Sequence, residues 1–293
     1  MSFESRFKKK NKGIAPSSVK TYLANIRRLA KAMGHEKIPD SGDWVKSKKL
    51  LTWLRKQNLN TRKILSAAGV KAAQLYGEGH IGLSKIMEKA TKEYETERGK
   101  QKKTKREAIL MPKTGYAAVG KAAAKLRAQV PPKIRNMRDY MILQDAWLLS
   151  FFAKHTPRLI ESVAIGKGKN RIQSLGNGWK ITLGQHKTAK SQGKSIIKLD
   201  KSLNEITSRL IKSRLPQIKH NFLLSAPRGG KISKSALSQR LTKITGKALG
   251  RGFSSQILRV LKATSQDATM KKVRLYLNEM GHGIQEERRY VAK

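Results

Sequence analysis

The sequence predicts an α+β protein, mainly helical, in which an N-terminal helical domain precedes a mixed, mostly helical domain with a small β-sheet. Apolar residues recur at helical spacing through residues 17–95, and a charged stretch without apolar side chains follows. Two short β-rich runs then interrupt the helical pattern before it resumes. The predicted domains are a flexible basic arm over 1–16, a helical domain over 17–96, a linker over 97–107 and a second domain over 108–293.

Four helices are expected in the first domain. The first begins near Ser17 and stops before Gly34, because glycine commonly follows the last turn of a helix. The other three are expected from about Asp43, from Asn60 or Thr61 to Leu75, and over Leu83–Tyr94. These helices predict a compact bundle with basic faces.

The second domain should begin with two helices, over 115–130 and 133–153, separated by Pro131-Pro132. Strands are expected at Trp179–Leu183 and Ser195–Leu199, where β-branched and aromatic residues cluster. A polar, lysine-rich turn joins these two strands. From Leu203 onward the pattern returns to helices.

The charge of the chain indicates its partner. Lysine and arginine total 64 residues and aspartate and glutamate 19, so the formal net charge is +45 at pH 7. A polyanion is needed to offset such self-repulsion, and nucleic acid is the first candidate. An anionic membrane surface is a weaker alternative, because no long apolar run occurs. The candidate DNA-binding residues are Lys8, Lys9, Lys10, Lys20, Arg27, Arg28, Lys102, Lys103, Lys105 and Lys190.

For the first lysine cluster, residues 8–12, a nuclear-localisation signal and a solubilising tail are the alternatives to DNA contact. No signal peptide is visible in this region, since no apolar core follows the charged residues. We therefore expect an intracellular, DNA-associated protein, in the nucleoid and cytoplasm or in the nucleus according to the host.

Composition excludes several chemistries. The chain has no cysteine, which excludes disulfides, thiolate zinc sites, iron–sulfur clusters and a cysteine nucleophile. The six histidines lack paired ligand spacing, and the glycines near Lys167 lack the P-loop pattern. We therefore expect no metal, no ATP and no other cofactor.

Four short motifs carry residues that suit phosphate chemistry. They are Thr156-Pro157-Arg158 with Glu161, the turn Gln185–Lys190, Ser255–Arg259 at the start of a helix, and Leu277–His282 followed by Arg288-Arg289-Tyr290. Alone, each has an ordinary structural explanation, such as a surface ion pair or an exposed hairpin tip.

Taken together and in this order, the four motifs resemble the tyrosine recombinase (phage integrase) family over nearly the whole chain. Residues 17–95 resemble the family's helical core-binding (SAM-like) domain, and about 108–293 its catalytic domain. The resemblance implies a site-specific DNA recombinase or integrase of a mobile element. Such an enzyme cleaves and rejoins strands through a 3′-phosphotyrosyl intermediate, without metal or ATP.

The resemblance assigns a role to each motif residue. Tyr290 is implied as the nucleophile, and Arg158 and Arg259 as the pair that binds the scissile phosphate. Arginine suits this role because its planar, permanently charged fork makes bidentate contacts with phosphoryl oxygens. Glu161 would hold Arg158 in place.

Three further residues complete the implied site. Lys187, or alternatively Lys190, matches the hairpin lysine that protonates the 5′-hydroxyl leaving group. His282 matches a histidine that contacts the phosphate and helps position or deprotonate the tyrosine. Gln256 stands where the family usually has histidine, and glutamine can donate a hydrogen bond but cannot shuttle a proton.

The implied partner is double-stranded DNA carrying a recombination site. Recombination joins two duplexes, so a homotetramer is expected on synapsed DNA and a monomer when the protein is free, with no membrane and no small-molecule cofactor. Three alternatives remain: a type IB topoisomerase-like enzyme, a catalytically lapsed relative that only binds DNA, and a structural binder of RNA or chromatin.

Overall fold

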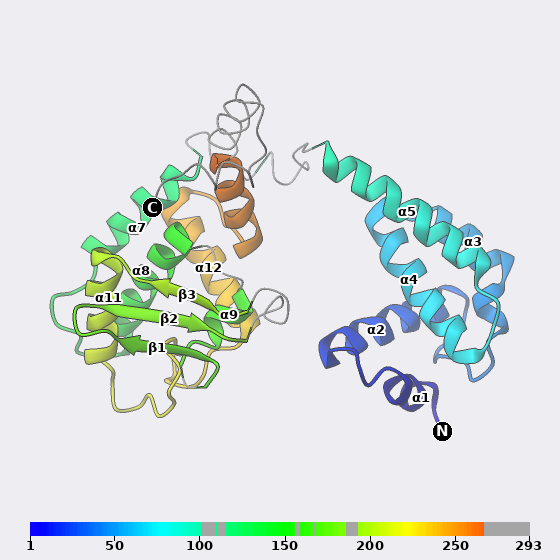
Figure 1. Cartoon of the computed structure of the whole chain (residues 1–293), viewed down its shortest axis with the longest axis horizontal. Helices are drawn as coiled ribbons and strands as arrows, with labels where there is room; N and C mark the ends of the chain where they lie inside the picture. Colours follow the sequence, from blue (N-terminus) through cyan, green and yellow to red (C-terminus); the bar gives the residue numbers. More distant parts are fainter. Residues whose placement is uncertain (101–108, 110–114, 156–158, 167, 186–192, 267–293) are drawn as a thin grey trace, which may run out of the picture. The chain divides into compact units, whose positions relative to one another are not determined.

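The computed structural model describes residues 1–100, 109, 115–155, 159–166, 168–185 and 193–266. The chain divides into two compact units, Met1–Lys103 and Thr104–Lys293 (Figure 1). The described residues are mostly helical and include one three-stranded antiparallel sheet. The predicted class, α+β and mainly α, is confirmed.

The first unit is a bundle of helices. It comprises α1 (Phe3–Lys10), α2 (Pro16–Ala32), a 3₁₀ turn (Asp43–Lys46), α3 (Lys48–Arg55), α4 (Leu59–Tyr76) and α5 (Ile81–Gly99). The four predicted helices are present, and the second is divided at Ser47, whose hydroxyl caps α3 by accepting from the backbone N–H of Leu50. Helix α5 extends to Gly99, into the stretch predicted as a linker; from residue 101 that stretch lies outside the described residues.

The prediction of a flexible arm over 1–16 is wrong for residues 3–10, which form α1. Phe3 and Phe7 lie four residues apart, so both face the bundle, and both are buried. The ring of Phe3 lies 5.0 Å from that of Tyr76 between centroids, and the Lys10 ammonium donates to the Gln74 carbonyl at 2.9 Å. Burial of the two aromatic side chains offsets the entropy lost when this basic segment is ordered.

The second unit is built around helix α8 (Met137–His155), in which ten of the 19 residues are buried. Its elements are α7 (Ala117–Ala128), α8 (Met137–His155), α9 (Leu159–Val163), β1 (Asn170–Ser174), β2 (Trp179–Leu183), β3 (Ser195–Lys198), α11 (Lys201–Lys212), α12 (Lys234–Leu249) and a helical stretch over 255–266. Helix α8 contacts α7, α11 and α12, and the Trp147 indole N–H donates to the buried Thr207 hydroxyl at 2.8 Å.

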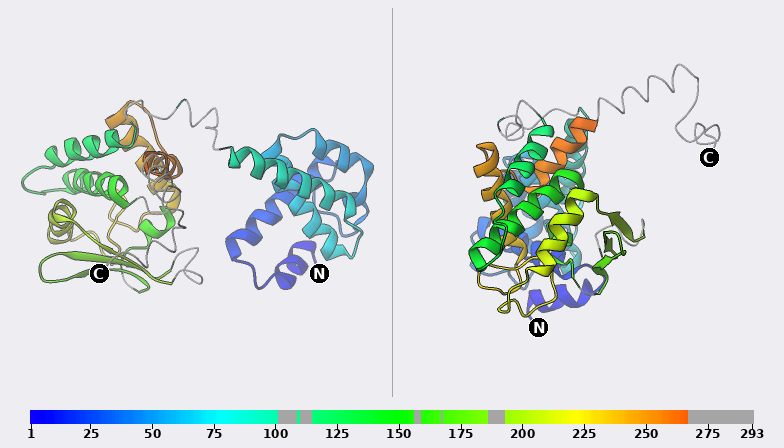
Figure 2. Two further views of the ribbon diagram at one scale, coloured as in Figure 1. Left: turned by 45° about the horizontal axis from the view of Figure 1, so that its top comes forward. Right: turned by 90° about the vertical axis from the view of Figure 1, so that its left-hand side faces the viewer.

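The sheet has the order β1-β2-β3, with antiparallel neighbours (Figure 1; Figure 2 gives two further views of the chain). The two predicted strands are confirmed as β2 and β3. Strand β1 was not predicted, because Ile172 is the single apolar residue in its five positions. Pairing of Ile172 with the buried Ile181 of β2, nine positions along the chain, places β1 in the sheet, so the strand depends on its hairpin partner rather than on its own residues.

Candidate nucleic-acid interface

Helices α1 and α2 carry all the predicted DNA-binding residues that the structure describes. These are Lys8, Lys9 and Lys10 on α1 and Lys20, Arg27 and Arg28 on α2, and all six are exposed. The other four, Lys102, Lys103, Lys105 and Lys190, lie outside the described residues.

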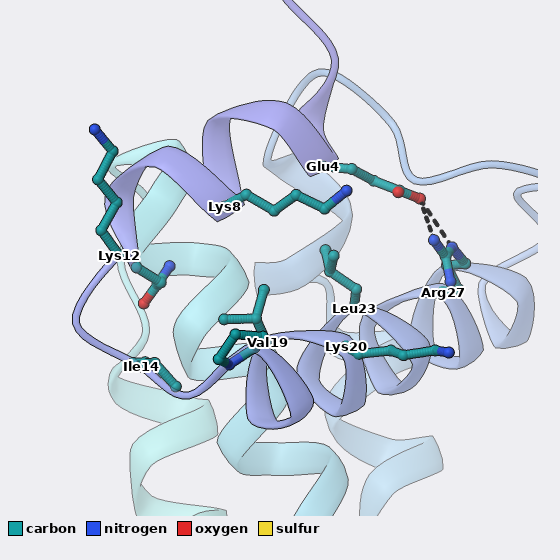
Figure 3. Close-up of a pocket in the computed structure, with 10 residues that line it drawn as sticks. Glu4, Lys8, Lys12, Ile14, Val19, Lys20, Leu23 and Arg27 are labelled. Atoms are coloured by element: carbon teal, nitrogen blue, oxygen red, sulfur yellow. Dashed lines mark hydrogen bonds and ion pairs between the residues drawn. The ribbon is translucent and has the colours of Figure 1, made fainter. Parts of the chain in front are cut away.

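Three of the six residues line one cavity, of about 470 Å³, between α1 and α2, which we call the basic cavity. Lys8 projects from α1, and Lys20 and Arg27 from α2, around the same opening, with Lys12 at its edge (Figure 3). The apolar part of the lining includes Val19 and Leu23, which are buried. The fold thus gathers cations that are up to nineteen positions apart in the sequence.

Glu4 is the acidic member of this cavity, and it pairs with Arg27. The Arg27 Nε donates to the Glu4 carboxylate at 2.9 Å. The ammonium groups of Lys8, Lys12 and Lys20 have no acidic partner among the residues that the structure describes. A phosphodiester backbone would supply the anions that these three groups lack. Each such contact would be weak, because the groups are exposed and salt screens them.

Some of the predicted catalytic residues lie inside the described ranges and the others lie outside them. Arg158, Lys187, His282 and Tyr290, with the alternative Lys190, lie outside the described residues. Gln256, Arg259 and Glu161 lie inside them. Gln256 is exposed in the first turn of the helical stretch 255–266, and Glu161 is 7% exposed in α9.

Arg259 lies one turn further along the stretch 255–266. The opposite side of this helix carries Ile257, Leu258 and Leu261, which are buried in the core of the second unit and so fix the direction of the arginine. The Arg259 Nε is buried and has no hydrogen-bond partner in the described structure. A buried donor without a partner costs free energy, and a phosphoryl oxygen is an acceptor that would remove this cost.

Lys262 joins this helix to the end of α8. Its ammonium donates to the backbone carbonyl of Lys154, one residue before the end of α8 and four before Arg158 in the sequence. Burial lowers the pKa of Lys262. The contact holds the helix of Arg259 against the chain segment that leads to Arg158.

Two further contacts hold the end of α8. The Lys154 ammonium pairs with Asp200, which caps α11, and donates to the Ser202 hydroxyl at 3.0 Å. His155, the last residue of α8, packs its ring 5.4 Å from that of Phe151. Burial, together with the nearby Lys262 charge, lowers the pKa of His155, because both disfavour the imidazolium.

The start of the lysine-rich turn is held by Asn170 of β1. The Gln185 N–H donates to the Asn170 side-chain oxygen at 2.7 Å, and the Asn170 amide donates to the Gln185 carbonyl at 3.1 Å. Next to it, a Cβ on Gly184 would lie 2.6 Å from the Lys169 carbonyl oxygen, so only glycine fits there without a shift. Residue 185, two positions before Lys187, is therefore fixed to the sheet.

Sequence reasoning missed Lys154, Lys262 and Asn170. None belongs to a motif, and each acts through a partner at least fifteen positions away. Only the weak strand pattern around Asn170 could have indicated one of them.

Within the described ranges, no three histidine, cysteine, aspartate or glutamate side chains gather closely enough to hold a metal ion. None of the helices in the same ranges combines the length and hydropathy that a transmembrane span requires.

Comparison with protein-family models gives no match, and comparison with curated proteins gives none either. Among solved structures, the chain is similar to XerA recombinase, with 14% sequence identity and a TM-score of 0.40. The match covers 96% of this chain and 88% of that one.

Proposed function

We propose that this protein is a site-specific DNA recombinase that breaks and rejoins strands through a covalent bond to Tyr290. One observation of the structure supports this most: Arg259, with its buried and unpartnered Nε, lies on a helix that Lys262 bonds to the last turn of α8. Because Arg158 follows that turn by three residues, the contact favours placing two guanidinium groups near one phosphate.

In the proposed reaction, the Tyr290 oxygen attacks the scissile phosphorus in line with the 5′-oxygen. A 3′-phosphotyrosyl bond forms, the bond to the 5′-oxygen breaks, and the leaving oxygen takes a proton from Lys187 or Lys190. The 5′-hydroxyl of a partner strand then attacks the phosphotyrosine and releases Tyr290. The intermediate conserves the energy of the phosphodiester, so the two steps need no ATP.

Arg158 and Arg259 neutralise the charge that develops on the non-bridging oxygens, and Glu161 orients Arg158. His282 contacts the phosphate and helps to deprotonate the tyrosine. Gln256, exposed in the first turn of its helix, donates a neutral hydrogen bond to the same phosphate. The basic cavity of the first unit contributes affinity for the duplex. Four protomers are proposed for the synapse of two duplexes.

The test is a nicked suicide duplex incubated with the full chain in the absence of metal and ATP. We expect a protein–DNA adduct on a denaturing gel, with the attachment mapped to Tyr290. Tyr290→Phe should abolish the adduct and keep duplex affinity, because the phenolic oxygen is the nucleophile and makes little of the binding surface. Tyr276→Phe is the matched control and should retain the adduct. An adduct that survives in Tyr290→Phe would contradict the assignment.

A catalytically lapsed, DNA-binding relative is the second candidate, and Gln256 is the residue that favours it. In that case the wild-type protein binds duplex DNA and forms no adduct on any nicked substrate. If adducts form, a supercoiled plasmid separates the remaining enzymes: relaxation without exchange between two duplexes indicates topoisomerase-type activity, and exchange indicates recombination.

A further inference from the structure

A second cavity of the first unit, of about 390 Å³, lies between α2 and α4 and is nearly uncharged. Its lining includes Ser17, Ser18, Thr21 and Asn25 from α2 and Lys63 and Ile64 from α4. Lys63 is its charged member, and its ammonium lies 4.4 Å from the centre of the Tyr94 ring. On a chain of net charge +45, this concave surface of hydroxyl, amide and methyl groups contrasts with the basic cavity.

Helix α2 separates the two cavities. Lys20 and Arg27 line the basic cavity, while Thr21 and Asn25 line the uncharged one. At 100° per residue, the exposed Ala24 and Arg28 lie between these two pairs on the helix surface. No aspartate or glutamate occurs in the 17 residues of α2. The helix therefore presents cations along one edge and hydrogen-bonding groups along the other, with the small side chain of Ala24 and the guanidinium of Arg28 between them.

Asn25 has the chemistry of a base-reading residue. It is half-buried, and its side chain makes no hydrogen bond with any residue in the described part of the chain. Its amide places N–H donors beside a carbonyl acceptor, which match the N7 acceptor and N6 donor of adenine in the major groove. Ile64, 43% exposed at the edge of the same cavity, offers a methyl surface that suits the thymine methyl group.

We infer that α2 enters the major groove of duplex DNA and that Asn25, with Thr21 beside it, reads base edges and prefers an A·T pair. The inference rests on the proposed function, and it adds how the protein recognises its target sequence in DNA. Phosphate contacts of Lys20 and Lys8 position the protein and carry no sequence information, so specificity requires neutral, directional groups of this kind. The major groove of B-DNA is about 12 Å wide and admits an α-helix.

The same geometry selects duplex DNA over duplex RNA, because the deep, narrow major groove of A-form RNA excludes a helix. Ser17 and Asn25 are eight residues apart, which is about 12 Å along the helix. At about 3.4 Å per base pair, this face of α2 spans roughly four base pairs. Thr21 contributes a methyl and a free lone pair there, since its hydroxyl hydrogen is donated to the Ser17 carbonyl at 2.9 Å.

The experiment is selection of binding sites from a pool of randomised DNA duplexes, with the full chain and its variants, followed by affinity measurements on the selected and mutated sites. Asn25→Ala should lose its preference for A·T at one position, by roughly five- to hundred-fold, with unchanged affinity for unrelated DNA. Asn177→Ala, the same change in the exposed turn between β1 and β2, is the matched control and should select the wild-type site.

Lys20→Ala separates base reading from phosphate binding. It should weaken binding to every sequence equally, with the same site selected. The steepness with which the logarithm of the association constant falls with the logarithm of salt concentration should decrease by about one. The inference is overturned if Asn25→Ala keeps the wild-type preference at every position, or if the wild-type protein binds duplexes without preference. Adduct formation by Tyr290 is measured on the same preparations, so failure of the proposed strand cleavage is detected separately from failure of base reading.

Discussion

Arg259 and His155 show how single residues of the second unit depend on their surroundings. The Nε of Arg259 and the Nε2 of His155 are both buried without a hydrogen-bond partner in the described structure. For the arginine, a permanently charged group, the phosphate bound in the proposed function would supply the missing acceptor. For the histidine, loss of the proton is the alternative to an unfavourable buried charge.

The lowered pKa of His155 predicts a loss of stability in acid. Below the ordinary imidazole value of 6.5, the unfolded chain binds a proton that the folded chain does not, so the free energy of unfolding decreases as the pH is lowered. One such group contributes a slope of at most about 1.4 kcal/mol per pH unit. The loss occurs between pH 6.5 and the folded pKa.

Urea unfolding of the full chain between pH 7.5 and 5 measures this slope. The signal is tryptophan fluorescence in a Trp44→Phe, Trp53→Phe background, in which the remaining tryptophans all lie in the second unit. His155→Gln should flatten it, and His80→Gln in the first unit should not. Equal slopes in the wild-type protein and His155→Gln would show that the histidine is not buried as described.

Helix α1 shows what an element gains from packing. Its sequence carries three consecutive lysines and reads as a flexible arm, yet Phe3 and Phe7 anchor it on the bundle. Helix α1 forms one side of the basic cavity, so the packing of Phe3 and Phe7 also positions Lys8 opposite Lys20.

Phe7→Ala should release α1. Removal of a fully buried aromatic side chain costs roughly 3 kcal/mol or more, which exceeds what an eight-residue helix gains from its own backbone bonds. We expect faster trypsin cleavage after Lys8, Lys9 and Lys10 and weaker duplex binding. Lys9→Ala, an exposed substitution on α1, should leave cleavage at the neighbouring lysines slow. Unchanged cleavage in Phe7→Ala would contradict the packed position of α1.

At the scale of the whole molecule, the net charge of +45 governs association. Each phosphate neutralised by lysine or arginine releases a condensed counterion, so affinity for duplex DNA falls steeply with salt. With about six to ten such contacts, the association constant should fall roughly 10³- to 10⁵-fold between 50 and 200 mM salt.

Fluorescence anisotropy with a labelled duplex measures this dependence on the full chain. Lys37→Ala lies outside both cavities of the first unit and should keep the wild-type slope, whereas Lys20→Ala should reduce it. A flat salt dependence would contradict a phosphate-based interface.

Local patterns in the sequence predict most of the helices and strands of this protein. Apolar residues at helical spacing identified α2, α4, α5, α7 and α8, and clustered β-branched residues identified β2 and β3, because these patterns follow from backbone geometry alone. Composition determined the charge and the absence of thiol chemistry. The roles of Tyr290, Arg158, Lys187 and His282 rest on the sequence resemblance and remain predictions.

The tertiary structure decided what depends on contacts with other elements. Strand β1 exists because it pairs with β2, and α1 is ordered because its aromatic residues find a bundle to pack against. Lys262 bonds to a carbonyl 108 positions away, and α2 acquires two different faces only because α1 and α4 lie on either side of it. Such contacts are absent from any local pattern, since their free energy arises only when the chain brings separate segments together.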